Sequence, residues 1–255
     1  MTHPNPPVPT GSGDERPAPL VEVHDGPDEL ATAIAGELLN RISDSQAAGN
    51  IPDIGLTGGS IARAVHREVA RLADDSGVDW GAVRFFFGDE RFVPAADPER
   101  NVGQARDDLL DVVGARQVFT APASDEVADL EESASQYAAT VQEQISGELE
   151  VLMLGIGPDG HVASLFPDHP ALAVIGTEAT GVSDSPKPPP ERVTLTFDTL
   201  NRAQCVWFLV SGEGKAEAVA RALAETGSIE ETPARGVHGR LETVWFLDRE
   251  AASRL

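Results

Sequence analysis

Apolar positions along the chain follow two different spacings. Leu30, Ile34, Leu38 and Ile42 recur every four residues, which predicts an amphipathic helix over about residues 27–47. Elsewhere, mostly apolar residues stand in short runs, which are typical of strands that are covered on both faces. The predicted strands are residues 53–57, 83–88, 151–154, 205–210 and 244–247.

Further helical patterns fall between these runs, over residues 60–73, 101–110, 127–145 and 213–225. Residues 192–197 alternate between polar and apolar side chains and predict an edge or antiparallel strand. Strands separated by helices form right-handed βαβ units. The pattern therefore predicts an α/β fold: a mainly parallel, twisted, doubly wound and Rossmann-like sheet with helices on both faces. In such a sheet, ligands bind outside the carboxyl ends of the strands.

The first nineteen residues show neither spacing. They contain six prolines and two glycines, and such a segment buries too little apolar surface to offset the entropy lost on ordering. We therefore expect a disordered, proline-rich tail over residues 1–19 and a single α/β domain over residues 20–255.

The composition narrows the classes of function. With 42 acidic and 19 basic residues, the formal net charge is −23, so the chain lacks the basic face that a general nucleic-acid binder needs. A single cysteine, Cys205, excludes an intrachain disulfide and a cysteine-based zinc site. No apolar run approaches the roughly 18–20 residues of a membrane span, and the N-terminus has no signal pattern. We expect a soluble, cytoplasmic protein that is a monomer or a small homo-oligomer.

Positive charge is scarce and unevenly placed. Residues 117–186 contain no lysine or arginine, and the only lysines are Lys187 and Lys215. Lys187 shares a proline-rich loop with Arg192, and Lys215 opens the helix predicted after strand 205–210. A lysine in the first turn opposes the helix dipole, so an anionic ligand would explain its position.

The loop after the first predicted strand carries a small-residue motif, TGGS at 57–60. Thr57, Gly58, Gly59 and Ser60 lead from a strand into a helix, where backbone N–H groups and hydroxyls can hold a phosphate. A plain turn capped by Ser60 is the structural alternative. The motif also loosely resembles a nucleophile elbow, which would make Ser60 a serine nucleophile.

The loop after the next strand contains two acids and an arginine, in FGDERFVP at 87–94, and Asn101 follows. Arg91 can hold a phosphate or carboxylate through two hydrogen bonds. An ion pair between Arg91 and a neighbouring acid is the structural alternative.

The loop after strand 151–154 is the most informative. Gly155, Gly157 and Gly160 form a literal G-x-G-x-x-G, but Pro158 and Pro167 prevent the long helix that a dinucleotide site requires. The glycines instead surround Asp159 and His161, which indicates a tight loop that presents an imidazole. Histidine is the usual general base at neutral pH, and Asp159 can fix its tautomer. The remaining histidines, His3, His24, His66, His169 and His238, have no comparable setting.

Together these motifs resemble the 6-phosphogluconolactonase family, within a superfamily that includes glucosamine-6-phosphate deaminase. The matching segments are TGGS at 57–60, FFFGDERFVP at 85–94, LGIGPDGHVASLFP at 154–167, SPKPPPERVTLTF at 185–197 and SGEGKAEAV at 211–219. The order and spacing of the resemblance extend over about residues 20–247. Asp168 stands where the family often has glycine, and Arg100 where it often has serine.

The resemblance implies hydrolysis of 6-phospho-D-glucono-1,5-lactone to 6-phosphogluconate in the oxidative pentose phosphate pathway, with no metal and no organic cofactor. We expect His161 to activate water, and we expect Asp159 to orient the His161 ring. The phosphate is expected at the TGGS turn with Arg91 and Lys187 or Arg192, with Lys215 as a further contact, and Asn101 at the sugar hydroxyls.

Two other functions stay open on the same fold. A sugar-phosphate isomerase or deaminase needs a carboxylate base, for which Asp89 or Glu90 is available. A sugar-phosphate sensor normally carries a DNA-binding segment, and no basic helix-turn-helix pattern is present.

Overall fold

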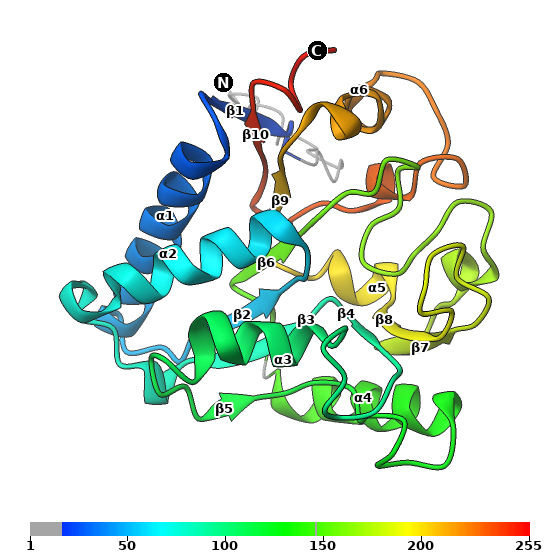
Figure 1. Ribbon diagram of the computed structural model, residues 1–255, viewed down its shortest axis with the longest axis horizontal. Helices are drawn as coiled ribbons and strands as arrows, with labels where there is room; N and C mark the ends of the chain where they lie inside the picture. The colour runs from blue at the N-terminus through cyan, green and yellow to red at the C-terminus, as the bar shows by residue number, and fades with distance from the viewer. Residues whose placement is uncertain (1–16, 146) are drawn as a thin grey trace, which may run out of the picture.

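A seven-stranded, wholly parallel sheet forms the centre of the molecule (Figure 1). The computed structural model describes residues 17–145 and 147–255, so most of the predicted tail lies outside the described residues. The strand order is β1-β10-β9-β6-β2-β3-β5. The strands are β1 (Leu20–His24), β2 (Asp53–Leu56), β3 (Arg84–Phe87), β5 (Gln117–Val118), β6 (Val151–Leu154), β9 (Cys205–Val210) and β10 (Glu242–Asp248).

Helices cover both faces of this sheet, as predicted. Residues alternate along each strand, so Val151 and Met153 of β6 belong to one apolar core, and Leu152 and Leu154 belong to the other. The first core is closed by α1 (Pro27–Ala47), α2 (Ser60–Ser76) and α3 (Asn101–Ala105); the second is closed by α4 (Leu130–Gln144), α5 (Phe197–Leu200) and α6 (Ala216–Leu223). Among the described helices, none combines the length and apolar content needed to cross a bilayer.

A second, smaller sheet is antiparallel and has the order β4-β8-β7. It comprises β4 (Asp89–Arg91), β7 (Ala179–Val182) and β8 (Arg192–Leu195). Gly88 joins the two sheets, because its N–H donates to Leu56 of β2 and its carbonyl accepts from Leu195 of β8. The expected strand at 192–197 is antiparallel as predicted, but it lies in the centre of its sheet and is buried at every position.

Several element boundaries differ from the sequence predictions. The helix expected from residue 127 begins at Leu130, because the Asp129 carboxylate accepts the Glu132 N–H and caps it. The helix expected over 101–110 is α3 followed by a π-helical turn, Arg106–Leu110. The helix expected over 213–225 is shorter: a 3₁₀ turn, Glu213–Lys215, precedes α6. Other 3₁₀ turns are Trp80–Ala82, Pro170–Ala173 and Pro233–Gly236.

Candidate functional site

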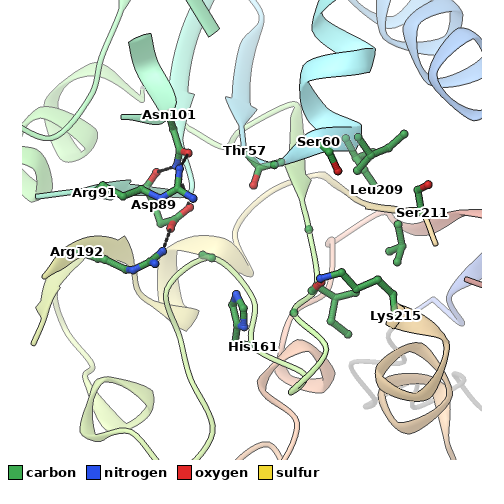
Figure 2. A pocket seen from close by; sticks show the side chains of 18 residues that line it. Thr57, Ser60, Asp89, Arg91, Asn101, His161, Arg192, Leu209, Ser211 and Lys215 are labelled. Carbon is green, nitrogen blue, oxygen red and sulfur yellow. Dashed lines mark hydrogen bonds and ion pairs between the residues drawn. The ribbon is translucent and has the colours of Figure 1, made fainter. Parts of the chain in front are cut away.

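A cavity of about 260 Å³ opens at the carboxyl ends of β2, β6 and β9, where the parallel sheet predicts a ligand site (Figure 2). Side chains from both sheets point into it. Nine of the eleven residues proposed from the sequence line this cavity: Thr57, Gly58, Gly59, Ser60, Arg91, Asn101, His161, Arg192 and Lys215. The other two, Asp159 and Lys187, lie directly behind His161.

The glycine-rich turn forms one wall of the cavity. Gly59 has φ +102°, a left-handed conformation that favours glycine, and Ser60 is the first residue of α2. A Cβ on Gly58 would overlap the side-chain oxygen of Asn101. The two glycines therefore allow the backbone to enter α2 while the turn stays close to Asn101.

His161 is held by two charged neighbours from different loops. Its Nδ1 lies 2.6 Å from Oδ1 of Asp159 and 3.1 Å from Nζ of Lys187, and Lys187 also donates to Asp159 at 3.2 Å. Burial would raise the pKa of the Asp159 carboxyl. The hydrogen bond and charge of His161, together with Lys187, instead hold that pKa well below its ordinary value. Asp159 is therefore a stable carboxylate partner for the imidazole.

The loop that carries His161 packs closely against its own side chains and its neighbours. A Cβ on Gly157 would overlap both the His161 ring and the Asp159 carboxylate, so this position requires glycine. The Phe166 ring packs on the His161 ring at a centroid distance of 4.6 Å. The carbonyl of Gly160 accepts the Ala234 N–H at 3.0 Å. As expected, no long helix follows the three glycines.

Arg91 of β4 and Asn101 of α3 form a second wall, which lies next to the glycine-rich turn. Arg91 donates to the side-chain oxygen of Asn101 and, at 3.0 Å, to the carbonyl of Glu99. Asn101 donates to the carbonyl of Asp89 at 2.8 Å. No ion pair between Arg91 and a carboxylate occurs in the part of the chain that the structure describes, so the structural alternative for Arg91 is not observed.

Arg192 is buried, and most of its hydrogen bonds go to the proline-rich loop. It donates to the carbonyls of Lys187, Pro188 and Pro189 at 3.1–3.3 Å. Its Nη1 lies 3.8 Å from Asp89, and its guanidinium lies over the Phe166 ring at 5.6 Å. Burial lowers the pKa of this guanidinium. Arg192 therefore shapes the loop as well as lining the cavity.

Lys215 reaches across the cavity to the His161 loop. Its Nζ donates to the carbonyl of Ile156 at 2.7 Å. Burial, together with the charge of Lys187, lowers the pKa of the Lys215 ammonium. Its side chain therefore projects into the site from the 3₁₀ turn before α6, which explains a lysine at that position.

Sequence reasoning missed some residues that support the site. Ser164 donates to Asp89 at 2.6 Å, and Ser211, which lines the cavity, donates to the buried Asp248 at 2.5 Å. Their partners are 75 and 37 residues away in sequence, so no local motif reveals them. Sequence reasoning considered Asp89 only as a base for a different reaction.

Other sequence hypotheses concern residues outside the His161–Asp159 pair. Ser60 has no hydrogen bond to a histidine within residues 17–145 and 147–255. His66 is fully buried, which lowers its pKa to about 4. Cys205 is buried, as expected, and its thiol accepts a hydrogen bond from Arg41. No cluster of three or more potential metal-binding side chains occurs among the described residues.

The fold and site define a class: α/β proteins with a cation-lined cavity at the carboxyl end of a parallel sheet, beside a histidine–carboxylate pair. The family model for glucosamine-6-phosphate isomerases and 6-phosphogluconolactonases matches residues 25–245, so the chain belongs to this family. This confirms the resemblance drawn from the motifs.

The similarity to known proteins extends over nearly the whole length of the chain. The chain is 42% identical to a 6-phosphogluconolactonase of Streptomyces coelicolor, covering 93% of this chain and 95% of the relative. It is 40% identical to that of Mycobacterium tuberculosis, covering 92% and 98%. The solved 6-phosphogluconolactonase of Trypanosoma cruzi superposes with a TM-score of 0.80 at 28% identity, covering 93% and 97%. A monomeric glucosamine-6-phosphate deaminase, at 22% identity and a TM-score of 0.79, shares the fold.

Proposed function

We propose that this chain hydrolyses 6-phospho-D-glucono-1,5-lactone to 6-phospho-D-gluconate, a step of the oxidative pentose phosphate pathway. The observation that carries the proposal is the His161–Asp159 pair, which faces a cavity lined by three cations and a glycine-rich turn. The names of the relatives support the same reaction. We further propose that residues 20–255 act as one domain.

His161 acts as the base through its outward nitrogen. Because Nδ1 contacts Asp159 at 2.6 Å, we assign the ring proton to Nδ1, which leaves the Nε2 lone pair for the cavity. Lys187 cannot donate to a protonated Nδ1, so its bond goes to Asp159. We therefore assign Lys187 to the orientation of Asp159, in place of the phosphate contact expected from the sequence.

The reaction needs one proton carrier. Nε2 takes a proton from water while the water oxygen forms a bond to C1, giving a tetrahedral intermediate. When the bond from C1 to the ring oxygen breaks, the imidazolium returns its proton to that oxygen, and the product is the open-chain acid. General acid–base catalysis of this kind contributes about 10²- to 10⁴-fold.

The phosphate binds among the cations that line the cavity. Thr57, the backbone of Gly58 and Gly59, and Ser60 supply N–H and hydroxyl donors, and the beginning of α2 adds a partial positive charge. Lys215, Arg91 and Arg192 supply full charges. Asn101, held between Arg91 and Asp89, is placed to contact the sugar hydroxyls.

A coupled assay tests the reaction and the base together. Lactone is generated in situ by glucose-6-phosphate dehydrogenase, and excess 6-phosphogluconate dehydrogenase reports the product through a second NADPH. Wild type is compared with His161→Ala, and spontaneous hydrolysis is subtracted. We expect wild type alone to accelerate the reaction. Equal acceleration by both would refute the mechanism, and acceleration by neither would refute the function.

The deaminase alternative requires a free carboxylate in the cavity. Asp89 lines the cavity, but its Oδ2 accepts from Ser164 at 2.6 Å and lies 3.8 Å from Arg192. Glu90 is buried and does not line the cavity. Ammonia release from glucosamine 6-phosphate is the discriminating measurement, and we expect none above background.

A further inference from the structure

A buried ion pair lies behind the Arg91–Asn101 wall and takes no part in the proposed chemistry. Glu90 and Arg100 are 1% and 2% exposed, and their nearest charged atoms are 3.7 Å apart. A charge in such a position is costly unless it is paired and hydrogen-bonded. Arg100 stands where the family often has serine, and the sequence motifs assign it no role.

The Glu90 carboxylate binds the backbone on both sides of the wall. Oε1 accepts the N–H of Arg91 at 2.8 Å and the N–H of Asn101 at 2.7 Å. Oε2 accepts the N–H of Val102 at 2.9 Å and the hydroxyl of Thr120 at 3.4 Å. One side chain therefore fixes two backbone segments that are ten residues apart in sequence, and both segments supply a side chain to the cavity.

Arg100 is more sparsely bonded than Glu90. Its Nη2 donates to the carbonyl of Ala121 at 2.6 Å, whereas Nε and Nη1 are buried without a hydrogen-bond partner among the described residues. Since two of its donors are unused, hydrogen bonding alone does not account for its burial. The ion pair with Glu90 does. Burial raises the pKa of the Glu90 carboxyl, and the Arg100 charge at this distance, together with the backbone N–H donors, opposes that rise.

We propose that Glu90, with its charge balanced by Arg100, is a positioning residue that sets Arg91 and Asn101 against the glycine-rich turn for substrate binding. The contact is close, since Asn101 leaves room for nothing larger than glycine at Gly58. A displacement of this wall would move both side chains relative to the turn and so weaken substrate binding. The kinetic part of this inference rests on the proposed lactonase function.

Glu90→Gln tests the role with little change in shape. The nitrogen of the substituted amide cannot accept hydrogen bonds, so the backbone N–H groups that face that atom lose their acceptor. We expect KM for the phosphorylated lactone to rise about tenfold while kcat changes less than threefold, because Arg91 and Asn101 act in binding. In an Arg91→Ala/Asn101→Ala background, the same substitution should change KM less than twofold.

The matched control is Asp53→Asn, which breaks another ion pair, between buried Asp53 and partly buried Arg84, at the opposite end of the sheet. It should lower Tm without changing KM. An unchanged KM in Glu90→Gln, an equal rise in Asp53→Asn, or a full rise in the Arg91→Ala/Asn101→Ala background would each overturn the proposal.

Two further measurements keep the test independent of folding and of lactonase activity. If Glu90→Gln does not fold, Arg100→Met should raise KM and Arg100→Lys should restore it, and equal KM values in both would overturn the proposal.

Hydrogen exchange gives a readout that needs no substrate. The Asn101 and Val102 backbone amides should exchange at least tenfold faster in whichever Glu90 or Arg100 variant folds. Unchanged exchange would overturn the proposal. This outcome does not depend on whether the proposed reaction is correct.

Discussion

The two ends of the parallel sheet hold their positive charges in different ways. At the amino end, Arg84 donates to both oxygens of Asp53 at 2.5 and 2.8 Å. Arg41 donates to Glu37 at 3.0 Å and to Glu242 at 2.9 Å. Each of these arginines is therefore neutralised by the group that orients it.

At the carboxyl end, the cations are oriented mainly by neutral oxygens. Lys215 donates to the carbonyl of Ile156, and Arg91 donates to the carbonyl of Glu99 and the amide of Asn101. A carbonyl fixes the direction of a cation without cancelling its charge. In a chain with a net charge of −23, this difference shows where positive charge is left without a carboxylate partner among the described residues: on Lys215 and Arg91, which line the cavity together with His161.

The largest expected effect comes from disturbing His161, the proposed base, which lies among these cations. Gly157→Ala adds a Cβ that would overlap both His161 and Asp159, so the pair must move. We expect kcat to fall about 100-fold, as for a displacement of about 1 Å at a catalytic group. Gly155→Ala is the control, because a Cβ there meets nothing within 4 Å. Equal kcat values in both variants would show that the loop geometry is unimportant.

The next prediction compares the effect on KM of removing one cation from each end of the sheet. Lys215→Met should raise KM for the phosphorylated lactone about tenfold, because a charge-assisted hydrogen bond contributes about 1.5 kcal/mol. Arg41→Met, at the amino end, should lower Tm slightly and leave KM unchanged, since partly exposed ion pairs contribute about 0–1 kcal/mol. Steady-state kinetics on both variants measure this contrast. A similar KM rise in both would remove the distinction between the two ends.

A smaller effect follows from the lowered pKa of Lys215. Burial and Lys187 favour its neutral form, so its positive charge is lost at a lower pH than for an ordinary lysine. Binding of 6-phosphogluconate should therefore weaken by a few fold as pH rises through that lowered pKa, because the anion binds the protonated form. Calorimetric titrations at several pH values measure this. Lys215→Arg should bind with a flatter profile, because arginine stays charged, and an identical slope would exclude Lys215 as the titrating contact.

Local patterns in the sequence predicted the parallel sheet and the faces of its helices. β6 and β9 are continuous apolar runs, and their boundaries match the prediction at both ends. Four of the described strands were not predicted: β1, β4, β5 and β7. β4, β5 and β7 are two to four residues long and lack a clear apolar pattern, and β1 is a largely exposed strand at the edge of the sheet. β4 is a strand because it pairs with β8, and that pairing joins segments about a hundred residues apart.

The site was predicted to a similar extent. Loops after strands identified His161 and the cavity cations, because the carboxyl ends of parallel strands meet at one edge. The position of Lys187 could not be predicted, since it depends on how the carbonyls of the proline-rich loop bind Arg192. The contacts of Glu90 were equally hidden, because its hydrogen-bond donors are supplied by segments that only the folded chain brings together.

The preference for a phosphorylated substrate tests the central claim most directly. The measurement is kcat/KM of the wild-type protein for 6-phospho-D-glucono-1,5-lactone against that for D-glucono-1,5-lactone. The charges kept free at the carboxyl end predict a ratio of at least about 100, equivalent to about 2.7 kcal/mol. Equal kcat/KM values for the two lactones would contradict the account, because the cations around His161 would then contribute nothing to recognition of the phosphate.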